Sequence, residues 1–351
     1  MALPRILIAG MSGGGGKTLV SLGLAAAWRG QGLSVAPFKK GPDFIDAAWL
    51  SRAAGNTCRN LDLYLMSSQA IRQSFRKACE HVDITVIEGN RGLFDGVDAR
   101  GTYSTAGLAK LLGAPVVLTV DCTKSTCTVA AAVLGCQRFD PDVPLKGVIL
   151  NRTGGPRHVS VIREAIEEHC GIPVLGALPR ISGLRFPERH LGLVPPQEHD
   201  HLHEAIVQAG EVAEKYLDLA AIRDVAQGAP DIETDGGPAQ GLCGSGHPRV
   251  RIGIFRDAAF QFYYPENLEA LEREGASLVE ISPLRDSGVG EVDALYIGGG
   301  FPETLAPTLA DNTAFRASLR RSIESGLPVY AECGGAVFLG EQLLFEGKSY
   351  D

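Results

Sequence analysis

The chain has 351 residues, 45% of them hydrophobic, and a formal net charge of −8 at pH 7. This length predicts two or three domains with substantial cores. The acidic balance, with no basic stripe, argues against nucleic acid as the main partner. No apolar stretch has the length or context of a membrane span or a signal peptide, so we expect a cytoplasmic protein that does not bind membranes. The eight cysteines are scattered, which is typical of reduced side chains.

The first motif, GMSGGGGKT at residues 10–18, directly follows an apolar run at residues 6–9. Its four successive glycines are Gly13, Gly14, Gly15 and Gly16. Glycines at such a turn allow backbone N–H groups to surround a polyphosphate. Lys17 would contact the outer phosphates, and the hydroxyl of Thr18 would bind Mg²⁺. The motif predicts a nucleoside triphosphate site, although Met11 replaces a consensus glycine; the alternative is a glycine-rich turn without a ligand.

The N-terminal part alternates short apolar runs with helical patterns. We predict strands at 5–9, 34–38, 84–88, 116–121, 147–151 and 174–178, and helices that include 19–28 and 159–169. Short β-branched strands separated by helices indicate an α/β fold, a P-loop-type, mostly parallel, doubly wound sheet. Ligands of such sheets bind at the carboxyl edge of the strands.

Charged residues follow two of these predicted strands. Glu88 ends one strand, where a second ligand for Mg²⁺ belongs. Lys39 and Asp43 follow another strand, and Asp95 lies in the turn GLFDG at residues 92–96. A lysine beside a phosphate neutralises charge that builds during transfer, and the aspartates would bind metal or substrate. The alternatives are polar turns and a solvent-exposed strand-end glutamate.

The composition changes at residues 226–248, which are rich in glycine and proline. We interpret this segment as a linker between a synthetase domain at 1–225 and a second α/β domain at 249–351. The second domain is predicted to contain strands at 250–255, 277–281, 294–297 and 328–331, with helices at 266–274 and 314–324.

The sequence PVYAECGG at residues 328–335 predicts a strand, a sharp turn and the start of a helix, with Cys333 at the turn. A thiol held there is exposed and suited to nucleophilic catalysis. The segment GGGFPE at 298–303 would supply backbone N–H groups for an oxyanion hole. The alternative is a cysteine that is simply packed at a tight turn.

Several motifs together resemble the cobyrinate a,c-diamide synthase family, which shares its ATP-binding superfamily with dethiobiotin synthetase. In the first domain they are GPDFID (41–46), RNLD (59–62), VIEGNRGLFDG (86–96) and RHLGLVPP (189–196). In the second they are RDAAFQFYYPENL (256–268), SPLRD (282–286) and GGGFPE, which resemble the family's glutamine amidotransferase domain. The resemblance extends from residue 4 nearly to the C-terminus.

The resemblance implies ATP-dependent amidation of the a- and c-acetate carboxylates of cobyrinate in cobalamin biosynthesis. ATP would phosphorylate a carboxylate, and ammonia from glutamine would displace the phosphate. Lys17, Thr18, Asp43 and Glu88 would form the ATP–Mg²⁺ site, with Lys39 on the phosphate side, Asn151 reading adenine, and Asp43 and Asp95 serving catalysis and substrate. Cys333 would form a glutamyl thioester, and the family suggests a homodimer at most.

Two departures from the family pattern matter. Phe44 stands where the family usually has tyrosine, so stacking on a flat macrocycle remains available but a hydroxyl does not. No histidine follows Cys333, so we expect a truncated chain or an inactive glutaminase half, and better use of free ammonia than of glutamine. Three other functions stay open: amidation of another tetrapyrrole (hydrogenobyrinate, sirohaem or nickel-sirohydrochlorin), a partition or regulatory ATPase, and a dethiobiotin-type ligase.

Overall fold

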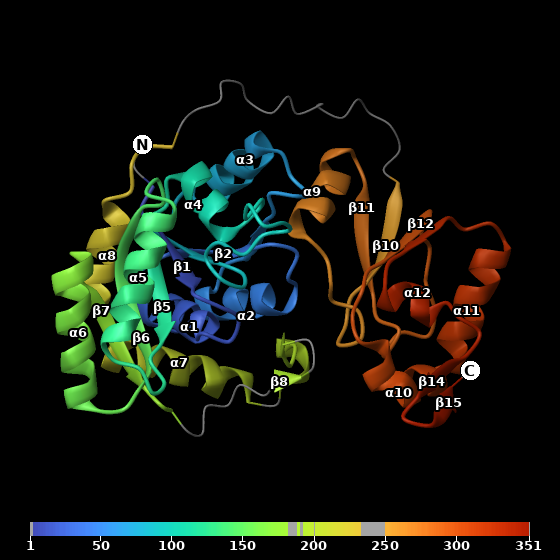
Figure 1. Cartoon of the computed structure of the whole chain (residues 1–351). Coiled ribbons are helices and arrows are strands. Elements are labelled where there is room, and N and C mark those ends of the chain that lie inside the picture. Colours follow the sequence, from blue (N-terminus) through green and yellow to red (C-terminus); the bar gives the residue numbers. More distant parts are fainter. Residues whose placement is uncertain (1–2, 182–187, 190–191, 200, 233–249, 351) are drawn as a thin grey trace. The chain divides into compact units, whose positions relative to one another are not determined.

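The structure is a computed structural model that describes residues 3–181, 188–189, 192–199, 201–232 and 250–350 (Figure 1). The chain divides into two compact units, Met1–Asp235 and Gly236–Asp351. Most of the predicted linker at 226–248 lies outside the described residues. Its first two residues belong to helix α8 (Leu219–Gln227), the last helix described in unit 1.

Unit 1 contains a seven-stranded sheet in the order β3-β2-β4-β1-β5-β6-β7. Its strands are β1 (Arg5–Gly10), β2 (Val35–Lys40), β3 (Arg59–Leu61), β4 (Ile84–Glu88), β5 (Val116–Asp121), β6 (Leu145–Thr153) and β7 (Val174–Pro179). Every neighbouring pair is parallel, as the sequence predicts. The chain extends the sheet first to one side of β1 and then to the other, so the loops after β1 and β4 open at the point where ligands of such folds bind.

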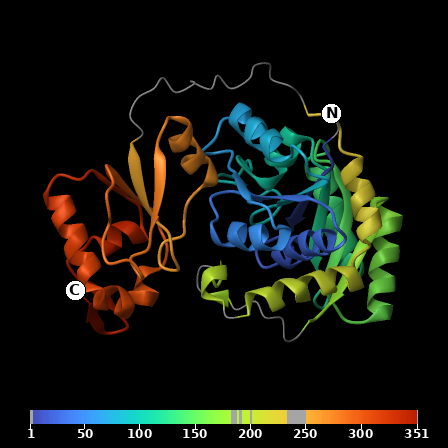
Figure 2. The ribbon, with the colours of Figure 1, turned by 180° about the vertical axis from the view of Figure 1, so that it is seen from behind.

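Helices cover both faces of this sheet (Figures 1 and 2). They are α1 (Lys17–Gly30), α2 (Ile45–Ala54), α3 (Ser68–Ala78), α4 (Thr105–Leu112), α5 (Cys127–Phe139), α6 (Pro156–Cys170), α7 (Leu202–Tyr216) and α8. Helix α7 lies alongside α1 in both views. The two helices approach so closely at Gly23 that a Cβ atom on this residue would lie 2.7 Å from the carbonyl oxygen of Ala209.

Several predicted elements extend further in the structure, and two elements that were not predicted lie near the candidate site. Strand β2 runs to Lys40, so Lys39 lies within the strand rather than after it. Helix α1 begins at Lys17, two residues before its predicted start. Helix α2 and the three-residue edge strand β3 carry no strong periodic pattern, and their positions are set by packing against β2.

A buried arginine stabilises the end of the sheet opposite the P-loop. The Arg5 side chain is 0% exposed, and its guanidinium donates to the carbonyl oxygens of Leu3, Leu112, Gly113 and Pro230. Arg5 therefore joins β1, the end of α4 and the segment after α8. Few side chains other than arginine present enough donors for this arrangement.

We expect the change Arg5→Met to lower the free energy of unfolding of unit 1 by about 2–4 kcal/mol, because buried carbonyls lose their donors. Urea unfolding followed by circular dichroism measures the effect. Lys110→Met is the control, since the exposed pair of Lys110 with Asp140 contributes about 1 kcal/mol or less. Equal effects of the two changes would contradict this role of Arg5.

Unit 2 contains a four-stranded parallel sheet in the order β11-β10-β12-β13. Its strands are β10 (Arg251–Phe255), β11 (Ser277–Ile281), β12 (Ala294–Ile297) and β13 (Val329–Ala331), followed by a hairpin of β14 (Leu343–Phe345) and β15 (Lys348–Tyr350). Its helices are α9 (Pro265–Arg273), α10 (Ala306–Asp311), α11 (Thr313–Glu324) and α12 (Gly334–Phe338). The buried rings of Phe255, Phe260 and Phe315 pack edge to face in its core.

Among the described residues of both units, no helix has the length and apolarity needed to span a membrane.

Candidate active sites

The P-loop joins β1 to α1 at the carboxyl edge of the large sheet. Gly14 and Gly16 have φ angles of 69° and 94°, which explains the need for glycine at these two positions. The Lys17 side chain is buried, and its Nζ donates to the carbonyl oxygen of Ser12 at 2.9 Å. Burial lowers the pKa of Lys17. The loop thus already curls around its lysine, as phosphate binding requires.

Glu88 at the end of β4 is the point where the charged side chains of unit 1 converge. Its Oε1 accepts hydrogen bonds from Thr18 Oγ1 at 2.8 Å and from Lys39 Nζ at 2.7 Å. Its Oε2 is buried and has no hydrogen-bond partner within the described part of the chain. Burial raises the pKa of Glu88 to about 7. A buried carboxylate oxygen without a partner remains available to an additional ligand, such as a metal ion.

Lys39 lies among three carboxylates. Besides Glu88, its Nζ contacts Asp46 Oδ2 at 2.5 Å and Asp43 Oδ2 at 3.9 Å. Burial alone lowers the pKa of Lys39, but the carboxylates of Glu88, Asp46 and Asp43 raise it well above its ordinary value. Lys39 therefore stays charged. Asp46 was not among the predicted site residues, although it is the last residue of the motif GPDFID.

Two loops are held next to the P-loop by specific hydrogen bonds. Asn60 on β3 donates to the carbonyl oxygens of Gly41 and Asp43, both at 2.8 Å. The exposed Asp95 accepts the N–H of Gly92 at 2.8 Å, and a Cβ atom on Gly92 would lie 2.7 Å from the carbonyl oxygen of Met11. The structure therefore brings the predicted residues Asp43 and Asp95 to the same edge of the sheet as Lys17.

Asn151 on β6 lies against the P-loop. Its side-chain nitrogen donates to the carbonyl oxygen of Gly15 at 3.0 Å, and its oxygen accepts the N–H of Arg152. A Cβ atom on Gly16 would lie 2.3 Å from the same side-chain nitrogen. In this structure the amide of Asn151 supports the loop, a role that the sequence did not predict.

The residues of unit 1 fit a Mg²⁺ ion that is bound together with a nucleotide. The Thr18 hydroxyl and the unpaired Oε2 of Glu88 are oxygen ligands of the kind that Mg²⁺ prefers. Within the described ranges, no three His, Cys, Asp or Glu side chains form a metal cluster. Mg²⁺ in nucleotide sites usually has only one or two protein carboxylates, the remaining ligands being phosphates and water.

Cys333 in unit 2 lies at a sharp turn between β13 and α12 and is exposed. Its φ and ψ angles are 46° and −113°, a strained conformation for a residue other than glycine. Such strain is found where a nucleophile is presented at a strand–helix turn. Helix α12 has only five residues, so its dipole adds little to the stabilisation of a thiolate.

The glycine segment after β12 borders this cysteine. A Cβ atom on Gly334 would lie 2.7 Å from the carbonyl oxygen of Gly300, and one on Gly299 would lie 3.6 Å from the Cβ atom of Cys333. The backbones of the motifs GGGFPE and AECGG touch at these positions, so a side chain larger than that of glycine would not fit between them. The structure brings the predicted nucleophile and the predicted N–H donors together.

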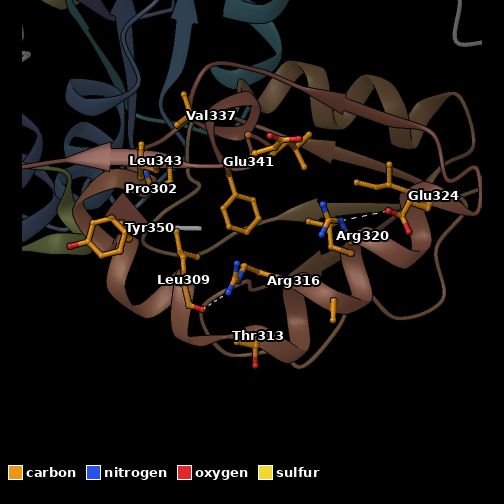
Figure 3. Close-up of a pocket in the computed structure, with 18 residues that line it drawn as sticks. Pro302, Leu309, Thr313, Arg316, Arg320, Glu324, Val337, Glu341, Leu343 and Tyr350 are labelled. Carbon is orange, nitrogen blue, oxygen red and sulfur yellow. Dashed lines mark hydrogen bonds and ion pairs between the residues drawn. The ribbon is translucent and has the colours of Figure 1, made fainter. Parts of the chain in front are cut away.

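Unit 2 also contains a cavity of about 580 Å³ between α10, α11 and the chain's last strands (Figure 3). Its lining is largely apolar, with Arg316 donating to the carbonyl oxygen of Ala310 at its edge. Cys333 is not among the lining residues. The cavity nevertheless borders the candidate glutaminase site, because Pro302 of the GGGFPE segment and Val337 of α12 are among its lining residues.

Comparisons with known proteins assign both units. Residues 6–194 match the model of the CobQ/CobB/MinD/ParA nucleotide binding domain, and residues 251–350 match that of the CobB/CobQ-like glutamine amidotransferase domain. The cobyrinate a,c-diamide synthase of Magnetococcus marinus is 43% identical, over 99% of this chain and 75% of that protein. The enzyme of the same name from Archaeoglobus fulgidus is 42% identical, over 98% and 74%. The chain belongs to the cobyrinate a,c-diamide synthase family.

Family membership confirms the resemblance seen in the sequence and the α/β fold with a nucleotide-binding P-loop domain. The chain spans about three quarters of the length of these relatives. Among solved structures, the MinD cell division protein of Aquifex aeolicus is 16% identical with a TM-score of 0.38, over 64% of this chain and 94% of that one. That similarity is too low to support an argument.

Proposed function

We propose that unit 1 uses ATP and Mg²⁺ to phosphorylate carboxylates of a corrinoid, the a- and c-acetate groups of cobyrinate, and that ammonia then converts them to amides. The observation that carries this proposal is the convergence of Thr18 and Lys39 on Glu88, whose second oxygen is buried and unpaired. A carboxylate is a poor electrophile, and phosphorylation gives it a leaving group.

Each residue has a defined task in this proposal. Lys17 and the P-loop N–H groups would bind the phosphates, and Thr18 and Glu88 would hold Mg²⁺, which would supply positive charge against the phosphate oxygens. Lys39 remains positively charged next to the transferred group. Asp43 and Asp95 lie on loops at the same edge, where they orient the substrate or complete the metal site. Asn151, whose amide already holds the loop at Gly15, would bind adenine with the remaining N–H of that amide.

The test of this function is the mass of the product. Cobyrinate, ATP, Mg²⁺ and ammonium are incubated with the chain, and each amidation is detected by mass spectrometry. Substrate carboxylates carrying an oxygen isotope should pass one labelled oxygen to inorganic phosphate per amide formed. Parallel reactions with hydrogenobyrinate and sirohaem identify the preferred tetrapyrrole. ATP hydrolysis without an amidated product from any of these acids would contradict the proposal.

Unit 2 is proposed to release ammonia from glutamine through Cys333. We expect the change Cys333→Ala to abolish any glutamine-dependent amidation while leaving the rate with ammonium within about twofold, because the two chemistries use different units. Product formation with each nitrogen source measures this. Cys127→Ala is the control, since Cys127 is also exposed but lies in unit 1. A Cys333→Ala chain that still uses glutamine would refute the assignment.

A further inference from the structure

The hydroxyl of Tyr263 lies where strands β10 and β12 separate. It accepts the N–H of Gly298 at 2.8 Å and donates to the carbonyl oxygen of Phe255 at 2.6 Å. The two strands pair in parallel register up to Ile254 and Tyr296. If the ladder continued, the N–H of Gly298 would bond directly to the carbonyl of Phe255. The phenol hydroxyl is therefore inserted in place of a ladder hydrogen bond.

The residues before Tyr263 hold the next part of the glycine segment. The N–H groups of Gln261 and Phe262 both donate to the carbonyl oxygen of Gly299 at 3.0 Å. A trans peptide points its C=O and N–H in opposite directions. These two bonds therefore turn the N–H of Gly300 away from Gln261 and Phe262.

The Gly299–Gly300 peptide borders the cysteine turn. The nitrogen of Gly300 lies 3.0 Å from the position that a Cβ atom on Gly334 would occupy. Gly300 has a φ angle of 157°, and a Cβ atom there would lie 2.0 Å from the carbonyl oxygen of Ala259. The peptide is therefore packed between the backbones of Gly334 and Ala259. The hydrogen bonds from the segment 261–263 determine the direction in which its N–H points.

Tyr263 is well suited to hold this loop. Its ring packs edge-on against Tyr296, with centroids 5.1 Å apart. A Cβ atom on Gly298 would lie 2.7 Å from the Tyr263 ring. Burial raises the pKa of the Tyr263 phenol, so the hydroxyl stays protonated and can donate to Phe255 while it accepts from Gly298.

We propose that Tyr263 is a positioning residue for glutamine hydrolysis, which fixes the segment Gly298–Gly300 so that the Gly300 N–H faces the developing oxyanion beside Cys333. The inference rests on the proposed glutaminase function. In that reaction the Cys333 sulfur bonds to the amide carbon and the C–N bond breaks. The thiol proton passes to the departing nitrogen, which leaves as ammonia, and water then hydrolyses the thioester. The Gly300 N–H would stabilise the negative oxygen of the intermediate.

The test compares two labels of Cys333 in the whole chain. One is a chloroketone analogue of glutamine, whose ketone oxygen occupies the oxyanion site. The sulfur of Cys333 attacks this reagent and displaces its chloride. The other is iodoacetamide, which reports only the accessibility and charge of the thiol. For Tyr263→Phe we expect labelling by the chloroketone to be about 10²-fold slower, as for a lost oxyanion donor, and labelling by iodoacetamide to change less than about twofold.

A matched control is Ser318→Ala. Ser318 also accepts a backbone N–H in unit 2, that of Val289 at 3.4 Å, and it is expected to leave the ratio of the two labelling rates unchanged. A purely structural role of Tyr263 would lower stability without changing this ratio. A ratio in Tyr263→Phe equal to that of the unchanged chain would overturn the proposal.

Hydrogen exchange of the Gly298 amide tests the positioning role independently of the labelling reactions. We expect the amide of Gly298 to exchange at least about tenfold faster in Tyr263→Phe, because it loses its acceptor. If that variant does not fold, Gly298→Ala displaces the loop from an intact Tyr263 and should reduce the labelling ratio in the same way. Equal exchange of Gly298 with and without the hydroxyl overturns the positioning role alone. If the unchanged chain shows no preference for the chloroketone, the glutaminase function itself fails.

Discussion

Replacing Lys17 with alanine should reduce ammonia-dependent amidation by about 10²–10³-fold, because a preorganised positive charge on the outer phosphates is lost. Lys17 is buried and already turned into the loop through its hydrogen bond to the carbonyl oxygen of Ser12. Steady-state product formation at saturating ammonium measures the loss. Binding of a fluorescent ATP analogue shows how much of it arises from weaker nucleotide binding.

Lys110→Ala is the control for this experiment. Lys110 lies in the same unit but pairs with Asp140 on the surface, and the rate should stay within about twofold because an exposed pair contributes little. Circular dichroism verifies that Lys17→Ala folds. Amidation by Lys17→Ala within tenfold of the unchanged chain would remove the P-loop from the proposed mechanism.

The change Glu88→Gln should produce a chain that folds normally but has lost about 10²-fold in amidation rate. The amide keeps the shape of the carboxylate but not the charge that Mg²⁺ requires. Lys39 retains its ion pair with Asp46, so no buried lysine is left unpaired. Removing one partner of a buried ion pair destabilises a protein chiefly by leaving the other charge unpaired. Because Asp46 still pairs with Lys39 and burial already raises the pKa of Glu88 to about 7, the free energy of unfolding should change little.

Two measurements verify this second prediction. Titration of the rate with Mg²⁺ should show that Glu88→Gln needs a higher concentration, while urea unfolding shows no loss of stability. Glu167→Gln, at the exposed pair with Arg163, should affect neither. A normal rate and normal Mg²⁺ dependence in Glu88→Gln would assign the unpaired Oε2 to a structural role.

The sequence predicts the large sheet well because its central strands are continuous apolar runs. Strands β4 and β5 have the predicted bounds, and helix α1 differs only at its ends. Helix α2 and strand β3 were missed because their sequences lack a strong period, and packing against β2 determines them. Local patterns indicate an element only where apolar residues form a continuous run or recur with a regular period.

The site was predictable in its residue types but not in its pairings. The order of strand, loop and helix predicts that Lys17, Lys39 and Glu88 share one edge of the sheet. The sequence could not show that Thr18 and Lys39 contact the same oxygen of Glu88, or that Asp46 balances Lys39. These pairings depend on side-chain directions that follow from tertiary packing. The same holds for Tyr263, whose hydroxyl meets residues far away in the sequence.

The unsatisfied oxygen of Glu88 has a consequence for the lifetime of the protein. A ligand that binds only the folded chain stabilises it by about 2.7 kcal/mol at one hundred times its dissociation constant, so the nucleotide and metal of the proposed site would raise the free energy of unfolding. Cells with ample ATP would therefore hold more of this protein against proteases than starved cells would.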